Sequence, residues 1–162
     1  MLKVVCNSSP LIHLARIGRL ELLRDFFEEV LIPEGVYDEC VIGGNGREDA
    51  DKIRSASWIM IDRIDNVELK KAINVFLDKG ESEAIALALQ VKADLIILDD
   101  YDAREFARIY DLKITGTIGI LIKAKHDGFI PSLKDVLEDL KDTGFWINKI
   151  LYSNILREVG EI

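Results

Sequence analysis

Short apolar runs alternate with segments of helical spacing along almost the whole chain. The clearest run, residues 95–98, contains only leucine and isoleucine, which is typical of a strand buried on both faces of a parallel sheet. Weaker strand signals lie at residues 3–6, 30–32, 58–61 and 113–115, with helical segments between them. This alternation predicts an α/β fold: a three-layer α/β/α sandwich with a mostly parallel central sheet.

Glycine and proline suggest where the helices begin and end. We expect Pro33 to open a helix that runs to Ile42, and Gly80 to separate two helices. Two more helical segments follow the last strand, near residues 133–140 and 146–159. The 162 residues suit a single domain, 1–162, with an extra C-terminal helical segment at about 132–160.

Composition narrows the functional classes. Hydrophobic residues make up 49% of the chain and charged residues 31%, so we expect a globular, cytoplasmic protein without a signal peptide or a membrane span. The net charge of −8 argues against a broad basic surface for nucleic acid, although acids gathered at a metal-dependent nuclease site would contribute to it. Gln90 is the only glutamine, while Ile, Lys and Glu are abundant, which points to a heat-adapted source.

The sequence contains few residues suited to soft-metal or triad chemistry. Cys6 and Cys40 lack metal-type spacing, and we expect buried free thiols. His13 and His126 lie far apart, which favours packing or surface roles. Neither a GxSxG elbow nor a Walker phosphate loop is present.

Acidic residues follow the clearest strand directly. Asp99 and Asp100 come straight after it, and Asp102 is close behind, while Asn7 follows the first strand. Ligands of open α/β sheets bind beyond the carboxyl ends of strands, and carboxylates held together usually need a cation. These oxygens therefore predict one metal site. The alternative is that Asp99 or Asp102 caps the helix that starts near Ala103.

Three glutamates could complete such a site. Glu39 lies late in the helix expected after Pro33, and Glu81 and Glu83 open the helix after Gly80. The helix dipole alone would also favour glutamate in a first turn, so an ordinary structural role stays open for Glu81 and Glu83.

At this point the residues resemble the PIN-domain family. The resemblance rests on an ordered set of motifs: residues 4–12 (VVCNSSPLI), the Pro33 segment ending in Glu39, residues 80–84 (GESEA), residues 98–100 (LDD) with Ala103-Arg104, and residues 116–121 (GTIGIL). The last motif is similar to an uncharacterised prokaryotic PIN-like branch. The set covers almost the entire chain.

The resemblance implies a small α/β nuclease that cuts single-stranded RNA with Mg²⁺ or Mn²⁺. Many members of the family act as the toxin of a toxin–antitoxin pair. The family has four acidic positions. The first is usually an aspartate, but in this sequence it corresponds to Asn7. The second corresponds to Glu39. The third corresponds to Glu83, with Glu81 as the alternative, and the fourth to Asp100, supported by Asp99 or Asp102.

The departure at Asn7 leaves two functional readings. The amide can offer a carbonyl oxygen but no negative charge, so metal affinity should be weaker. The result would be either a slow nuclease or a module that binds RNA or protein without cutting.

The resemblance also suggests where substrate and partners bind. Ser9 matches a hydroxyl often found beside the first acid. Thr117 opens a helix whose backbone N–H groups could hold a phosphate, although an ordinary capped turn explains it too. Four cations, Arg104, Arg108, Lys123 and Lys125, could line an RNA path or simply form a solvated face. The apolar set in residues 145–159 is too wide for one narrow stripe, so part of it is expected to seek a partner. The resemblance implies a twofold homodimer there, or else an antitoxin groove, and a helix docked on its own core is the alternative.

Overall fold

The computed structural model describes residues 2–162 and contains a five-stranded sheet in which all neighbouring strands are parallel. The strand order is β3-β2-β1-β4-β5. The strands are β1 (Val4–Cys6), β2 (Val30–Pro33), β3 (Ile59–Asp62), β4 (Leu95–Ile97) and β5 (Ile114–Thr115). The helices before β4 are α1 (Ser8–Arg16), α2 (Glu21–Phe27), α3 (Glu34–Tyr37), the π-helix η1 (Asp38–Ile42), α4 (Glu48–Ser55), α5 (Val67–Asn74) and α6 (Lys79–Val91). Those after it are α7 (Tyr101–Ile109), α8 (Thr117–His126), α9 (Leu133–Asp142) and α10 (Lys149–Glu158).

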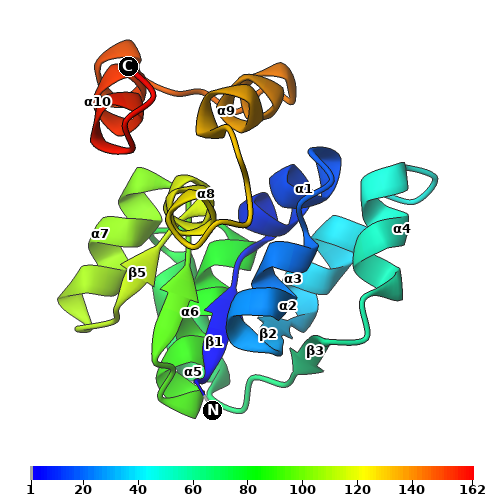
Figure 1. Ribbon diagram of the computed structural model, residues 1–162. Coiled ribbons are helices and arrows are strands. Elements are labelled where there is room, and N and C mark those ends of the chain that lie inside the picture. The colour runs from blue at the N-terminus through cyan, green and yellow to red at the C-terminus, as the bar shows by residue number, and fades with distance from the viewer. Residues whose placement is uncertain (1) are drawn as a thin grey trace.

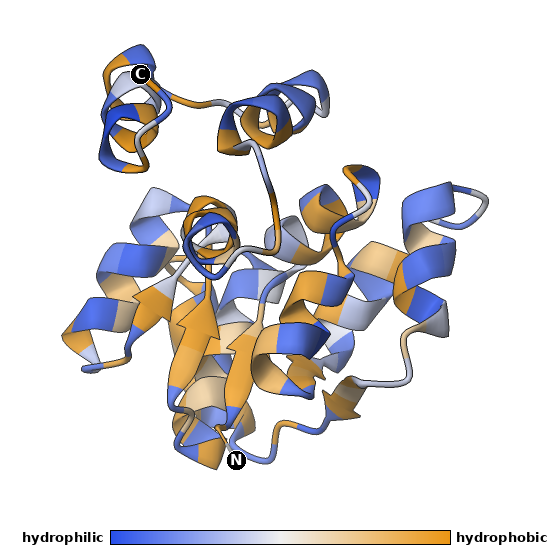
Figure 2. Ribbon diagram, viewed as in Figure 1, coloured by the Kyte–Doolittle hydropathy of each residue, from blue (hydrophilic) through white to orange (hydrophobic). Residues whose placement is uncertain are grey.

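Alternate residues of the central strands enter two separate cores. Val4 and Cys6 pack with α1, α2 and α8, whereas Val5 packs with α5, α6 and α7. This follows from the period of two along a strand, which sends successive side chains to opposite faces. Helices therefore cover both faces of the sheet (Figure 1). The strands are mostly hydrophobic, whereas the helices carry many hydrophilic residues (Figure 2), and the predicted α/β/α sandwich is confirmed.

Parallel pairing brings the carboxyl ends of β1 and β4 to one edge. Cys6 lies opposite Ile97, and the Asn7 N–H extends the ladder by donating to the Ile97 carbonyl at 3.0 Å. The residues after β1 and after β4 therefore emerge side by side, as the prediction of a shared site requires.

One expected helix boundary was confirmed and another was wrong. Pro33 ends β2 and is the N-cap of α3, and the helical path runs to Ile42 as expected, although its second half is the π-helix η1. Gly80 lies inside the first turn of α6 instead of separating helices. There Asp78 and Glu81 form a reciprocal capping box, which starts the helix at Lys79.

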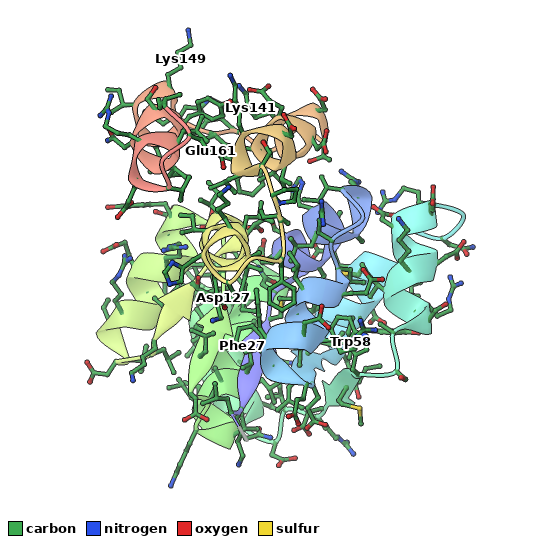
Figure 3. The ribbon with its side chains drawn as sticks, viewed as in Figure 1. Phe27, Trp58, Asp127, Lys141, Lys149 and Glu161 are labelled. Carbon is green, nitrogen blue, oxygen red and sulfur yellow. The ribbon has the colours of Figure 1, made fainter. Side chains whose placement is uncertain are left out.

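The C-terminal helices are joined to the body and to each other by polar contacts. The Glu161 carboxylate, labelled between α9 and α10 in Figure 3, accepts from the Leu133 and Lys134 N–H groups at 2.7 and 3.0 Å. On α1, His13 pairs with the Thr143 hydroxyl at 2.8 Å and packs edge-on against Phe145. These contacts fix α9 over α1 and α8.

Helix α10 begins later than expected, at Lys149, because the Asn148 side chain accepts from the Ile150 and Leu151 N–H groups. Trp146 therefore lies in the preceding loop, where it is 80% exposed. Both cysteines are buried free thiols, as predicted. Within residues 2–162, every helix is too short or too polar to cross a bilayer.

Candidate active site

The turn after β1 supplies a buried amide to the edge of the sheet. Asn7 is only 5% exposed, and its Oδ1 atom has no hydrogen-bond partner among residues 2–162. A buried polar atom without a partner costs free energy, and most such atoms in folded proteins are satisfied. The orphaned oxygen therefore marks a place where a ligand would restore a missing interaction.

Glu39 points toward the same place from η1. Its Oε2 accepts from the Ser8 hydroxyl at 2.9 Å, which fixes the carboxylate beside the β1 turn. A π-helical turn shifts the helical register of the residues it contains, and such turns are frequent at functional sites. The segment therefore combines an irregular backbone with an acid held by a serine from a distant part of the chain.

A glycine lies where these oxygens meet. A Cβ atom added at Gly80 would lie 2.9 Å from Glu39 Oε1, 3.4 Å from Asn7 Oδ1 and 3.7 Å from Asp78 Oδ1. Three oxygens from three separate parts of the chain thus lie close to one buried point, and a side chain at position 80 would collide with Glu39. This small oxygen-lined space is named the Gly80 cradle below.

Glu83 lies deeper, on the face of α6 that packs toward α3. It is 5% exposed, its Oε1 accepts weakly from the Gly35 N–H at 3.3 Å, and its Oε2 has no partner among the described residues. A Cβ atom at position 35 would lie 2.1 Å from Oε2, so Gly35 is what allows the carboxylate to sit there. Glu83 Oε2 is thus a second buried oxygen without a hydrogen-bond partner among the described residues.

The three aspartates after β4 have three different roles. Asp99 accepts from the Ser9 hydroxyl at 2.8 Å and from both the N–H and the hydroxyl of Thr117 at 2.7 Å. Asp100 caps α7 by accepting from the Ala103 N–H at 3.0 Å, so the expectation that Asp99 or Asp102 would be the cap was wrong. Asp102 is exposed in the first turn of α7.

Asp100 also faces Glu81 across the edge of the sheet. Burial, followed by the charges of Asp78 and Asp100, raises the pKa of Glu81 from 4.5 to about 7. Carboxylates forced together disfavour a second negative charge, and a cation relieves this repulsion. The edge is therefore held in a state that favours binding of either a proton or a metal ion.

The candidate substrate residues are also placed near this edge. Asp99 fixes Ser9 and Thr117, so the Thr117 hydroxyl is bound to a carboxylate instead of capping α8, whose N-cap is Gly116. Arg104 is half-buried, and its Nη1 donates to the Leu98 carbonyl at 3.0 Å. Arg104 is therefore anchored beside the aspartates.

The donor set suits Mg²⁺ or Mn²⁺, because the donors are hard oxygens and two of the buried ones, Asn7 Oδ1 and Glu83 Oε2, have no partner among residues 2–162. Among residues 2–162, however, no three His, Cys, Asp or Glu side chains already form a metal-binding group. The arrangement fits a divalent ion held by an amide oxygen and separate carboxylates, without a preformed three-carboxylate centre.

The structure brings together Asn7 with Glu39, and Glu81 with Asp100, while Glu83 occupies a buried place of its own against Gly35. The sequence interpretation missed Ser8 and Asp78, which position Glu39 and Glu81. Asp78 could have been found, because Asp at position 78 followed by Glu three residues later is the capping-box pattern. No sequence signal links Ser8 to Glu39, because that contact depends on the tertiary fold.

Comparison with known proteins agrees with the geometry. A family model described as a PIN domain matches residues 3–161, which includes both C-terminal helices. No curated protein matches the chain. PIN domains are nuclease-type modules that generally depend on divalent metals. From the match over nearly its full length and from its parallel α/β/α fold, the chain belongs to the PIN-domain family.

Proposed function

We propose that the protein is a ribonuclease that cuts single-stranded RNA with Mg²⁺ or Mn²⁺. The observation that carries the proposal is the convergence of Asn7 Oδ1 and Glu39 Oε1 at the Gly80 cradle, beside the Glu81–Asp100 pair. Asn7 Oδ1 has no hydrogen-bond partner among residues 2–162 and the Glu39 carboxylate lies beside it, so a bound cation would give both oxygens a partner.

Asn7 and the acidic residues share one task in the proposed reaction. Glu39, Asp100 and Asn7 would hold the metal, with Glu83 or Glu81 as a further carboxylate. A bound divalent ion supplies polarisation of the phosphoryl oxygen and a lowered pKa for an attacking water.

Other residues prepare the site for substrate. Because its pKa is about 7, Glu81 exchanges a proton near neutral pH in the metal-free protein. Asp99 orients the Ser9 and Thr117 hydroxyls at the mouth of the site, and Arg104 places a fixed positive charge beside it.

The test is cleavage of labelled single-stranded RNA. Wild-type protein with Mn²⁺ should cut, and a chelator should stop the reaction. Asp100→Asn keeps a good helix cap but removes the charge, so it should lose most activity without unfolding. Glu105→Gln, an exposed change on the same helix, is the matched control. Equal cleavage by the Asp100 and Glu105 variants would overturn the assignment.

A second candidate is a module that keeps the PIN fold and binds RNA or protein without cutting. It is favoured by Asn7 at the usual aspartate position and by the lack of a three-acid group among residues 2–162. The Asn7→Asp variant separates the two candidates. Gained or increased cleavage in this variant would identify a weakened nuclease, and continued inactivity at saturating Mn²⁺ would favour the binding module.

We further propose a cytoplasmic protein that forms a twofold homodimer and acts as the toxin of a toxin–antitoxin pair. The exposed Trp146 and Ile150 support the dimer, because they border an open groove of about 710 Å³ at the start of α10, and Leu151 on the same helix is also exposed. Light scattering should give twice the chain mass, and Ile150→Asp should halve it. A wild-type mass of 18.3 kDa would exclude the stable dimer and leave an antitoxin as the partner for this surface.

A further inference from the structure

An open groove of about 500 Å³ runs from the acidic edge across α1 to the loop before α4. Ser8 and Glu39 line one end and belong to the candidate active site. Arg16 and Arg47 line the other end, with His13 also on its wall. The groove therefore leads directly from the proposed metal ligands to two positively charged side chains.

A single buried carboxylate holds both arginines. Asp49 is 5% exposed, and its Oδ2 and Oδ1 accept from Arg16 Nε at 2.8 Å and Arg47 Nε at 3.2 Å. Burial alone would raise the pKa of Asp49, but the hydrogen bonds from Arg16, the Ala50 N–H and Arg47 hold it below its ordinary value. Asp49 is therefore ionised, and it joins α1 to α4, which lie side by side in Figure 1.

The two guanidinium groups carry more positive charge than is needed to pair with Asp49. One guanidinium would neutralise Asp49, whereas two leave an excess positive charge at this end of the groove. Both arginines bind Asp49 through Nε, and the described residues accept no hydrogen bond from the outer Nη groups of either. Their side chains are 35% and 48% exposed, so these donors reach solvent.

The groups around the arginines do not cancel this charge within the groove. Burial lowers the pKa of His13, which is therefore neutral near pH 7. Glu39 is the acid that lines the groove, at the opposite end, where Ser8 binds it. The groove is thus acidic at the proposed metal site and basic at the arginine pair.

We propose that Arg16 and Arg47 bind a backbone phosphate of single-stranded RNA, next to the phosphate positioned at the acidic edge. The inference rests on the proposed function, and it assigns the direction in which the strand leaves the site. The two Nη groups of a guanidinium can donate paired hydrogen bonds to phosphate oxygens. Because Asp49 already fixes each arginine through Nε, less side-chain entropy is lost when the Nη groups bind the phosphate. A nucleic-acid strand carries a phosphate at every nucleotide, so a strand cut at the acidic edge presents a neighbouring phosphate to the arginines, and RNA is the strand that the proposed function assigns.

The test measures binding rather than cleavage. Fluorescence anisotropy would follow a labelled short RNA of random sequence in chelator, across a range of salt concentrations. The Arg16→Gln/Arg47→Gln variant should bind about tenfold or more weakly, because it loses hydrogen bonds to a charged group. Its salt slope should fall by roughly 0.7, the value for one lost phosphate contact on a single strand. Arg16→Lys/Arg47→Lys should recover the slope but only part of the affinity.

The controls separate charge, folding and function. Arg54→Gln removes one charge from α4 outside the groove, where Arg54 pairs with Asp51, and should bind like wild type. Removing both arginines leaves Asp49 buried without cations, so Asp49→Asn is added to the double variant to keep it folded. Wild-type protein that binds no RNA would overturn the proposed function and this inference together. Wild-type binding that the folded arginine variants retain in full would overturn this inference alone.

Discussion

Replacing Glu81 by glutamine should stabilise the metal-free protein at neutral and alkaline pH but not in acid. Burial and the charges of Asp78 and Asp100 raise the pKa of Glu81 from 4.5 to about 7. A carboxyl group with a raised pKa in the folded chain binds its proton more tightly there than in the unfolded chain. Its stabilising contribution is therefore complete below about pH 4.5 and is lost as the pH rises to about 7.

The magnitude follows from the size of the shift. A rise of about 2.5 pH units at 1.36 kcal/mol per unit sets an upper limit of about 3.4 kcal/mol. Glu81 is only partly buried, so water screens the repulsion. We therefore expect the glutamine variant to be more stable than wild type by about 1–2 kcal/mol above pH 7. For a chain of this size the unfolding temperature should then rise by about 2–8 °C in the variant above pH 7.

Urea unfolding in chelator, repeated from about pH 4 to about pH 8, measures this difference. Glutamine can still accept from the Asp78 N–H, so the capping box survives the change. Glu68→Gln, in the exposed first turn of α5, is the matched control and should show little dependence on pH. A stability difference that is the same at every pH, or that favours wild type above pH 7, would refute the reasoning.

Two further substitutions test how the site is supported. Gly35→Ala places a Cβ atom 2.1 Å from Glu83 Oε2, so it should lower the free energy of unfolding in urea by about 1–3 kcal/mol. Adding Glu83→Ala should recover much of that loss. Strictly additive losses in the double variant would contradict the close contact. Asp99→Leu removes the acceptor of three hydrogen bonds from Ser9 and Thr117, so it should lower the free energy of unfolding by about 3 kcal/mol or more. A change within about 0.5 kcal/mol, as at ordinary surface positions, would show that Asp99 does not organise this edge.

The sheet, and the edge at which the candidate residues lie, could be predicted because both follow from local patterns. The apolar run at 95–98 and the weaker run at 3–6 indicated parallel strands, and β1 and β4 are indeed neighbours. Since ligand sites of such sheets lie beyond the carboxyl ends of the strands, Asn7 and the aspartates after β4 were expected at one edge.

The division of roles among the aspartates could not be predicted. Asp99 is committed to Thr117, which lies 18 residues later, whereas Asp100 became the helix cap. The sequence prediction named Asp99 or Asp102 as the cap, and only the tertiary position of α8 decides that Asp99 is taken by Thr117.

Two backbone features were not predicted from the sequence, for different reasons. The π-helix at η1 leaves no periodicity of its own over five residues. Gly80 looked like a helix breaker, but the Asp78–Glu81 capping box outweighs the roughly 1 kcal/mol cost of a glycine in a helix. A side chain there would also collide with Glu39 Oε1, so the glycine is better explained by the site than by the helix.

The central claim is that the oxygens around the Gly80 cradle hold a divalent cation. Calorimetric titration with Mn²⁺ tests it most directly, using wild type, Asn7→Asp and Asp100→Asn. We predict measurable binding to wild type, tighter binding to Asn7→Asp because a charge replaces the orphaned amide oxygen, and weaker binding to Asp100→Asn. Absence of Mn²⁺ binding at millimolar concentration in both wild type and Asn7→Asp would contradict the claim.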